Sequence, residues 1–462
     1  MKKRVVFFIL PIITLLCFSG CSLVLPAVEE LISFGEDAFS FEGESGDIRI
    51  NDLGEYGTGS TAFSGEYKTL KNSFSDAKTA TVMVYINGSD LEEEGGAASE
   101  DIEEMLSAKI GGNVNVVIET GGARKWENEK ISEEYTERFI LKDGELIKIK
   151  GETFSADMTE AETLRDFISY CKDNYPADRN MLILWNHGGG AVEGYGYDTV
   201  AANDDALTLD ELQTALEGGK TYFDFIGFDA CLMSGVETAA ALCDYADYLI
   251  ASEDFESSFG WYYKTWLEEL SDDIQIPTVR LGKIIIDSFT EYNEENDETG
   301  ILSLTDLSQA GNLFESWFEF LKNNESRFEN ARFDNGFNIS DRARKIKKGI
   351  FEDVFNLIFS GEDTLDDYCL ADMGDVLKSI GGKGYDEFKD SLEKAVIYTG
   401  KTDGVSLYGM SAIIPVKSEY TYELMHNAFI NCGFPEEYLE LLSNISGLSE
   451  REGEQLQSWQ AS

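Results

Sequence analysis

The thiol of Cys231 is a potential nucleophile and the imidazole of His187 a potential base. Each of the two residues lies just after an apolar run. The runs occupy residues 223–228 and 180–185, and their length and composition predict buried strands. A thiol is mostly protonated at neutral pH, so it needs a base to become the thiolate that attacks a carbonyl. The pair therefore predicts cysteine catalysis, with Cys231 as the nucleophile and His187 as the base.

The elements around these residues decide whether the two side chains can meet. Glycines follow His187 at 188–190 and permit backbone conformations that other residues resist. If the two strands are parallel neighbours, both residues lie at one edge of the sheet, where open α/β sheets bind ligands. Residues 207–216 predict the crossover helix between the strands. We assign the amides of Gly188 and Cys231 to the oxyanion hole that the reaction needs.

The rest of the chain predicts an α/β fold, a mostly parallel sheet flanked by helices. The expected elements are strands at 81–86, 113–119 and 245–251, an edge hairpin at 135–149, and amphipathic helices through 164–171, 233–243 and 307–321. Strand, helix and strand within residues 81–119 form a βαβ unit.

A strand ending in His-Gly, followed by a strand ending in Asp-Ala-Cys, resembles the clostripain family of cysteine peptidases, which share the caspase-like fold. Both halves of the motif stand in the family's order, and Ser252-Glu253 matches a later family feature. The likeness is close over residues 79–265 and looser over 266–462. It implies a caspase-like catalytic domain over 79–265 and a C-terminal α+β region over 266–462 that completes the peptidase unit.

The resemblance also implies an activity and a specificity. Family members cleave peptide bonds with a cysteine–histidine dyad that needs no third member. A family aspartate at the position of Asp229 contributes to the pocket for the side chain before the cut, and a carboxylate there favours Arg, then Lys. Glu253 and Asp254 are expected to add a second acidic wall. The implied substrates are proteins or peptides with basic residues; no cofactor is required, and the family's calcium requirement stays open for this chain.

Alternatives remain for both the site and the function. Asp229 could only cap a turn or hold backbone amides, and Cys231 could be a buried thiol. The family's usual Asp-Asn before an acidic-Leu pair reads Gly-Ser here, ahead of Asp90, so Ser89 replaces a side chain that contacts substrate. The second class of function is therefore a surface-tethered binding lipoprotein that keeps the fold without useful catalysis.

The N-terminus predicts export. A basic start precedes an apolar stretch at 5–18 that is too short to span a bilayer comfortably. It ends in Phe-Ser-Gly-Cys, which resembles a bacterial lipobox whose cysteine, here Cys21, is lipidated; an ordinary secretory cleavage nearby is the alternative. We expect a lipoprotein signal peptide at 1–20, an acidic Gly/Ser-rich tether at 21–78, and a location on the cell membrane or cell surface.

The charge balance of the chain limits the kinds of partner that it can bind. The chain has 87 Asp and Glu against 37 Lys and Arg, a net charge of −50, so it should repel nucleic acid and attract cationic peptides and divalent ions. Solubility alone is the other explanation. With only two histidines, the chain cannot form a multi-histidine metal site. We expect a monomer with no nucleic-acid partner and no metal site.

Overall fold

A computed structural model of the chain describes residues 74–201, 206–333, 370–414 and 419–448. The predicted signal peptide, Cys21 and most of the predicted tether lie outside these residues. Within the described part, no helix combines the length and the apolar character that crossing a membrane requires.

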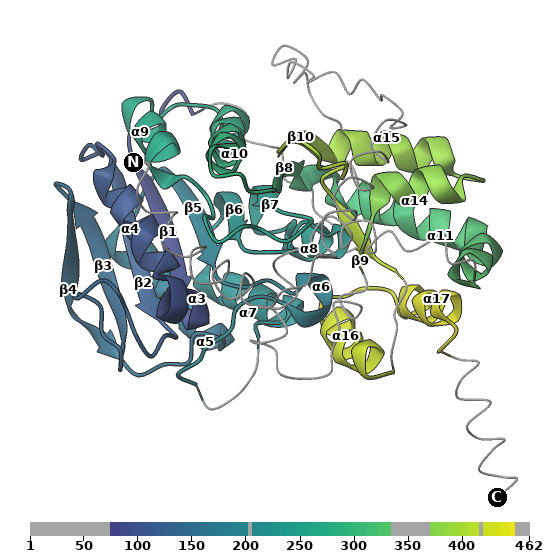
Figure 1. Ribbon diagram of the computed structural model, residues 1–462, viewed down its shortest axis with the longest axis horizontal. Helices are drawn as coiled ribbons and strands as arrows, with labels where there is room; N and C mark the ends of the chain where they lie inside the picture. Colours follow the sequence, from purple (N-terminus) through teal and green to yellow (C-terminus); the bar gives the residue numbers. More distant parts are fainter. Residues whose placement is uncertain (1–73, 202–205, 334–369, 415–418, 449–462) are drawn as a thin grey trace, which may run out of the picture. The chain divides into compact units, whose positions relative to one another are not determined.

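A nine-stranded sheet organises the described chain (Figure 1). Its parallel centre consists, in spatial order, of β7 (Ala246–Ala251), β6 (Phe223–Asp229), β5 (Arg179–Trp185), β1 (Ala80–Asn87) and β2 (Val114–Gly121). Antiparallel strands extend both edges: β3 (Thr136–Lys142) and β4 (Glu145–Phe154) beside β2, and β8 (Ile301–Asp306) and β10 (Val396–Lys401) beside β7. The predicted α/β fold with a mostly parallel sheet is confirmed.

The central strands are buried because helices cover both faces of the sheet. β1, β6 and β7 are buried along their whole length, as continuous apolar runs predict for parallel strands. The runs at 180–185 and 223–228 form β5 and β6, which are parallel neighbours as predicted. The expected edge hairpin is β3–β4, and it turns at Asp143 and Gly144, whose φ angles are 53° and 75°.

The helices of the first part of the chain lie on opposite faces of the sheet (Figure 1). One face carries α5 (Ala161–Asn174), α7 (Leu209–Gly219) and α8 (Val236–Leu242); the other carries α4 (Ala97–Ser107), α9 (Tyr263–Asp272) and α10 (Thr278–Glu295). The predicted crossover helix is α7, and a capping box between Thr208 and Glu211 fixes its start. Strand order reverses between β1 and β5, which is where open α/β sheets form a ligand crevice.

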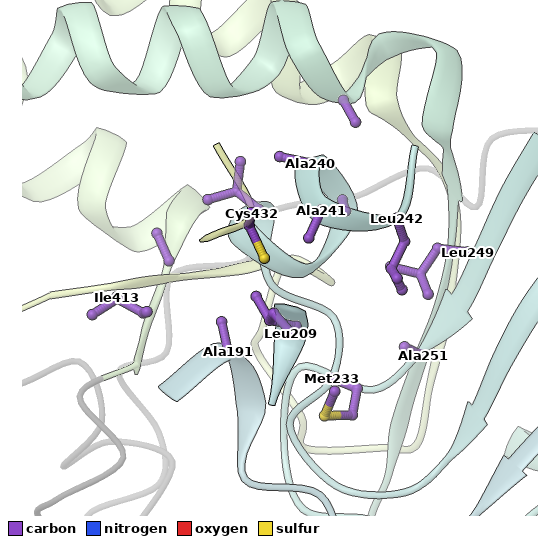
Figure 2. Packing of buried hydrophobic residues seen from close by; sticks show 14 of the residues in the cluster. Ala191, Leu209, Met233, Ala240, Ala241, Leu242, Leu249, Ala251, Ile413 and Cys432 are labelled. Atoms are coloured by element: carbon purple, nitrogen blue, oxygen red, sulfur yellow. The ribbon is translucent and has the colours of Figure 1, made fainter. Parts of the chain in front are cut away.

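The later part of the chain adds strands to the same sheet and packs against the segments that follow β5 and β6. Its elements are β8, η2 (Leu307–Gln309), α11 (Ala310–Phe333), β9 (Leu370–Asp372), α14 (Met373–Ile380), α15 (Tyr385–Ala395), β10, β11 (Ser411–Ile413), α16 (Glu419–Asn431) and α17 (Glu436–Ser446). β9 and β11 form a separate two-stranded sheet. Figure 2 shows Ile413 and Cys432 from this part in the same buried cluster as Ala191 of α6 (Gly190–Glu193) and Met233, which follows β6.

Candidate active site

His187 lies in a loop that a small bridge fixes at the end of β5. Two residues after Trp185, the His187 carbonyl accepts a hydrogen bond from the amide of Gly196 (3.0 Å). This bond belongs to an antiparallel bridge between Gly188 and Tyr195. The two bridge residues form a non-hydrogen-bonded pair, so the Gly188 amide points out of the bridge. The bridge therefore leaves the Gly188 amide unused, and its oxyanion role stays a prediction.

Cys231 lies in a strained turn held against the end of β7. The next residue, Leu232, has a φ of 66°, in the left-handed region that costs a branched side chain on the order of 1–3 kcal/mol. Two backbone hydrogen bonds hold this turn, from the amide of Leu232 to the carbonyl of Asp254 (3.1 Å) and from Ser234 to Ser252 (2.8 Å). The thiol is therefore presented by a fixed backbone.

The sulfur of Cys231 differs from the other described cysteine sulfurs in its surroundings. It accepts a hydrogen bond from the amide of Glu256 (3.2 Å) and donates one to the carbonyl of the same residue (3.9 Å). Cys171, Cys243 and Cys432 are buried thiols without disulfides, and burial raises the pKa of Cys171 well above its usual value and that of Cys432 to about 12. Cys231 is the described cysteine that is partly exposed.

The two loops touch. Trp185 of β5 is the register partner of Asp229 of β6, so His187 and Cys231 each lie two residues beyond a paired position. A Cβ atom at Gly188 would lie 2.0 Å from the carbonyl oxygen of Cys231, which only glycine avoids. The structure thus brings together the two loops that the sequence predicts to be neighbours.

A carboxylate that sequence reasoning left without a role contacts the histidine. Asp90 lies in the first turn of α3 (Ser89–Gly95), directly after β1, and its Oδ1 is 2.9 Å from Nε2 of His187. The side chains of Asp90 and His187 are 13% and 20% exposed. Burial would raise the pKa of Asp90, but hydrogen bonds from His187 and Ser89 outweigh burial and lower it. The signal in the sequence was a carboxylate following another predicted strand.

Asp229 is buried and bonded to a neighbouring loop. Its carboxylate accepts hydrogen bonds from the hydroxyl of Tyr263 (2.7 Å) and from the amide of Trp261 (3.2 and 3.3 Å). Burial raises its pKa to about 6 against the opposing effect of these bonds. The backbone amide contact that the sequence left open as an alternative is therefore present, and substrate binding by Asp229 stays a prediction.

Sequence reasoning missed two acidic side chains of α4 that act electrostatically on Asp229. Asp101 accepts a hydrogen bond from Nε1 of Trp185 (2.6 Å), and Glu104 accepts one from the amide of Tyr263 (3.0 Å). Burial, together with the charge of Asp229, raises the pKa of Asp101 well above its usual range and that of Glu104 to about 7. Both carboxyl groups therefore keep their protons to higher pH than usual.

Glu253 and Asp254 follow β7 and differ in their surroundings. The carboxyl group of Glu253 is buried, accepts a hydrogen bond from the amide of Gly409 (2.6 Å) and bonds to the side chain of Asp372. Burial and the charge of Asp372 raise the pKa of Glu253 well above its usual range, so Glu253 is the protonated partner. Asp254 is partly exposed, and its carbonyl supports the Cys231 turn. Substrate contact by either residue stays a prediction.

A calcium requirement is an expectation from the family resemblance. Among the described residues, no group of three or more His, Cys, Asp or Glu side chains is arranged to hold a metal ion. The calcium requirement stays an expectation from the family resemblance.

A sheet that presents a thiol and an imidazole at the carboxyl ends of neighbouring parallel strands defines a class, the cysteine peptidases of caspase-like fold. Within this class, the chain belongs to the clostripain family, whose model matches residues 84–422. The family predicted from the His-Gly and Asp-Ala-Cys motif is confirmed.

Individual relatives agree with this assignment. The chain is 28% identical over 198 residues to clostripain from Hathewaya histolytica, and the match covers 37% of each of the two proteins. A secreted C11 cysteine protease from Bacteroides thetaiotaomicron, solved with an irreversible peptide inhibitor, has a TM-score of 0.54 and 18% identity; the match covers 80% of this chain and 99% of that protein. An inactive zymogen C11 protease from Parabacteroides distasonis has a TM-score of 0.52 and 23% identity, with 78% and 99% covered. At 18% and 23% identity, the likeness to the two solved structures supports the fold alone.

Proposed function

We propose that this protein is an exported cysteine endopeptidase that cleaves peptide bonds after Arg, and less readily after Lys, through Cys231 and His187. The observation that carries the proposal is the contact between the two loops, in which a Cβ at Gly188 would lie 2.0 Å from the carbonyl oxygen of Cys231. Family membership supplies the reaction class.

The proposed reaction follows from the chemistry of these groups. His187 takes the proton of the Cys231 thiol, and the thiolate attacks the carbonyl carbon of the substrate. The resulting oxyanion accepts hydrogen bonds from the amides of Gly188 and Cys231. His187 then gives its proton to the leaving amine as the C–N bond breaks, which leaves a thioester. Water, deprotonated by His187, hydrolyses the thioester and regenerates the thiol.

Covalent labelling together with hydrolysis tests the proposal against the binding lipoprotein. A panel of fluorogenic peptides varied at the residue before the cut should show turnover, highest with Arg. A peptidyl chloromethyl ketone ending in Arg should stop hydrolysis in step with stoichiometric modification of Cys231, measured by mass spectrometry of peptides. Labelled protein that never hydrolyses any peptide would instead favour the binding function. Running the panel with calcium and with chelator decides whether the family's calcium requirement extends to this chain.

Export and lipid attachment form a second part of the proposal. A similar solved protein is described as secreted, and the segment ending at Cys21 resembles a lipobox. Wild-type protein should fractionate with membranes and carry a lipidated N-terminal cysteine, whereas Cys21→Ser should be soluble or unprocessed. Mass spectrometry of the mature N-terminus measures this, with Cys243→Ala as the control that removes a buried thiol. Wild-type protein found wholly unlipidated in the culture fluid would contradict lipid attachment.

A further inference from the structure

Asp90 reaches His187 because β1 is the neighbour of β5 in the sheet. The register pairs Ile86 of β1 with Trp185 of β5, so the two strands end at the same edge. α3 begins immediately after β1, and its first turn places Oδ1 of Asp90 at 2.9 Å from Nε2 of His187. The β1, β5 and β6 loops thus converge, carrying a carboxylate, an imidazole and a thiol.

The carboxylate is held more firmly than an ordinary surface ion pair. Asn186, the residue before His187, donates through Nδ2 to Oγ of Ser89 (3.0 Å) and to the carbonyl of Asn87. Ser89 adopts a left-handed φ of 47° and hydrogen-bonds to the side chain of Asp90. The β1 and β5 loops are therefore cross-linked immediately before the Asp90–His187 contact, which supports the placement of the carboxylate beside the imidazole.

We propose that Asp90 is a positioning residue for His187, so that the site works as Cys231–His187–Asp90 rather than as a dyad. This inference rests on the proposed peptidase function. Because Nε2 faces an ionised carboxylate, it carries the hydrogen of the neutral imidazole, and Nδ1 is the nitrogen that accepts a proton. The thiol proton moves to Nδ1 and later to the leaving amine, while Asp90 stays ionised throughout and stabilises the imidazolium.

Two substitutions separate this role from simple structural support. Asp90→Asn keeps the size of the side chain, but its amide donates a hydrogen bond to Nε2, which puts the hydrogen of the neutral imidazole on Nδ1 and removes the base. Asp90→Ala removes the contact and leaves the tautomer free. We expect Asp90→Asn to lower kcat by about 10²- to 10⁴-fold, and Asp90→Ala to lower it less, with KM little changed in both. Support of the fold alone predicts the reverse order, because Asn preserves the packing better than Ala.

The pH dependence gives a second signature. Loss of an anionic partner lowers the pKa of an imidazolium, and His187 must be neutral to take the thiol proton, so the acid limb of kcat/KM should move to lower pH in Asp90→Ala. Glu94→Gln is the matched control, because Glu94 is an exposed carboxylate on the same helix. It should keep the wild-type rate and pH profile. Asp90 variants with wild-type kcat and an unmoved acid limb would overturn the positioning role while leaving the peptidase proposal intact.

A measurement that does not need activity completes the test. The chain has two histidines, so the spectrum of ¹⁵N-histidine-labelled protein contains two imidazoles, and His187→Gln assigns them. We expect neutral His187 to carry its hydrogen on Nε2 in the wild type and on Nδ1 in Asp90→Asn, with a lower pKa in Asp90→Ala. A wild-type hydrogen on Nδ1, or a His187 pKa unchanged by Asp90→Ala, would refute the inference even if the protein cleaved no peptide.

Discussion

Replacing Cys231 by Ala should abolish peptide hydrolysis, and replacing His187 by Ala should lower kcat by several orders of magnitude, up to about 10⁶-fold. The reason is that the thiolate forms the bond to the substrate and the imidazole moves every proton of the reaction. Because the two groups act as a unit, the double variant should be no slower than Cys231→Ala alone. Initial rates on an Arg peptide, with active-site titration of the wild type, measure the effect.

The chain offers matched controls for both substitutions. Cys243 follows α8 as a buried thiol, and His426 on α16 packs its ring against Tyr422 with 5.5 Å between centroids. Neither residue is part of the site, so Cys243→Ala and His426→Ala should keep activity within about twofold. Thermal unfolding of all variants separates lost catalysis from lost fold. Full activity in Cys231→Ala would remove the nucleophile from the proposal.

The sequence predicts the strands of the site well because almost all of their residues are apolar. β5 and β6 are short apolar runs that end in polar or glycine-rich residues, a pattern that central parallel strands need and few other elements share. The helix between them has its own capping residues, Thr208 and Glu211, which fix its start locally. Strand, crossover helix and strand therefore follow from local signals alone.

The carboxylate beside His187 could not be predicted in the same way. Asp90 lies far from His187 in sequence, and the two meet only because β1 pairs with β5 on one side and with β2 on the other. Strand order depends on how all the helices cover the sheet. The sequence of a single segment does not contain this information. The apolar segment of β1 is predictable, but its partner across the sheet is not.

The late strand shows a different limit. The likeness to later family elements also predicts a strand within residues 405–415, whereas the structure has a strand at Ser411–Ile413. Gly409 precedes it with a φ of 111°, and its Cβ position is 2.6 Å from Oγ1 of Thr399. The backbone turns there because β10 lies against it. This is a tertiary contact that composition cannot reveal.

Among the predicted substitutions, replacement of Asp229 has the second largest expected effect, a loss of specificity for Arg. We expect Asp229→Ala to reduce kcat/KM for Arg substrates by about 30-fold to several thousandfold, since losing the partner of a desolvated charge costs roughly 2–5 kcal/mol. The carboxylate can accept two charge-assisted hydrogen bonds from the guanidinium of Arg, whereas the ammonium of Lys makes a single contact. Its partners Tyr263 and Trp261 are neutral donors that do not cancel its charge.

Because Asp229 also holds the segment around Trp261, Asp229→Asn is the sharper variant. Asn keeps an acceptor for Trp261 and Tyr263 but removes the charge, so it should lose the Arg preference while its Cys231 still reacts normally with iodoacetamide. Burial raises the pKa of Asp229 to about 6, so the neutral form persists to higher pH than usual. Arg turnover in the wild type should therefore fall as pH drops through about 6, and Asp229→Asn should lack this limb. Retained Arg preference in Asp229→Asn, or a wild-type preference for Asn, Gly or Asp before the cut, would show that Asp229 supports the loop and does not select the substrate.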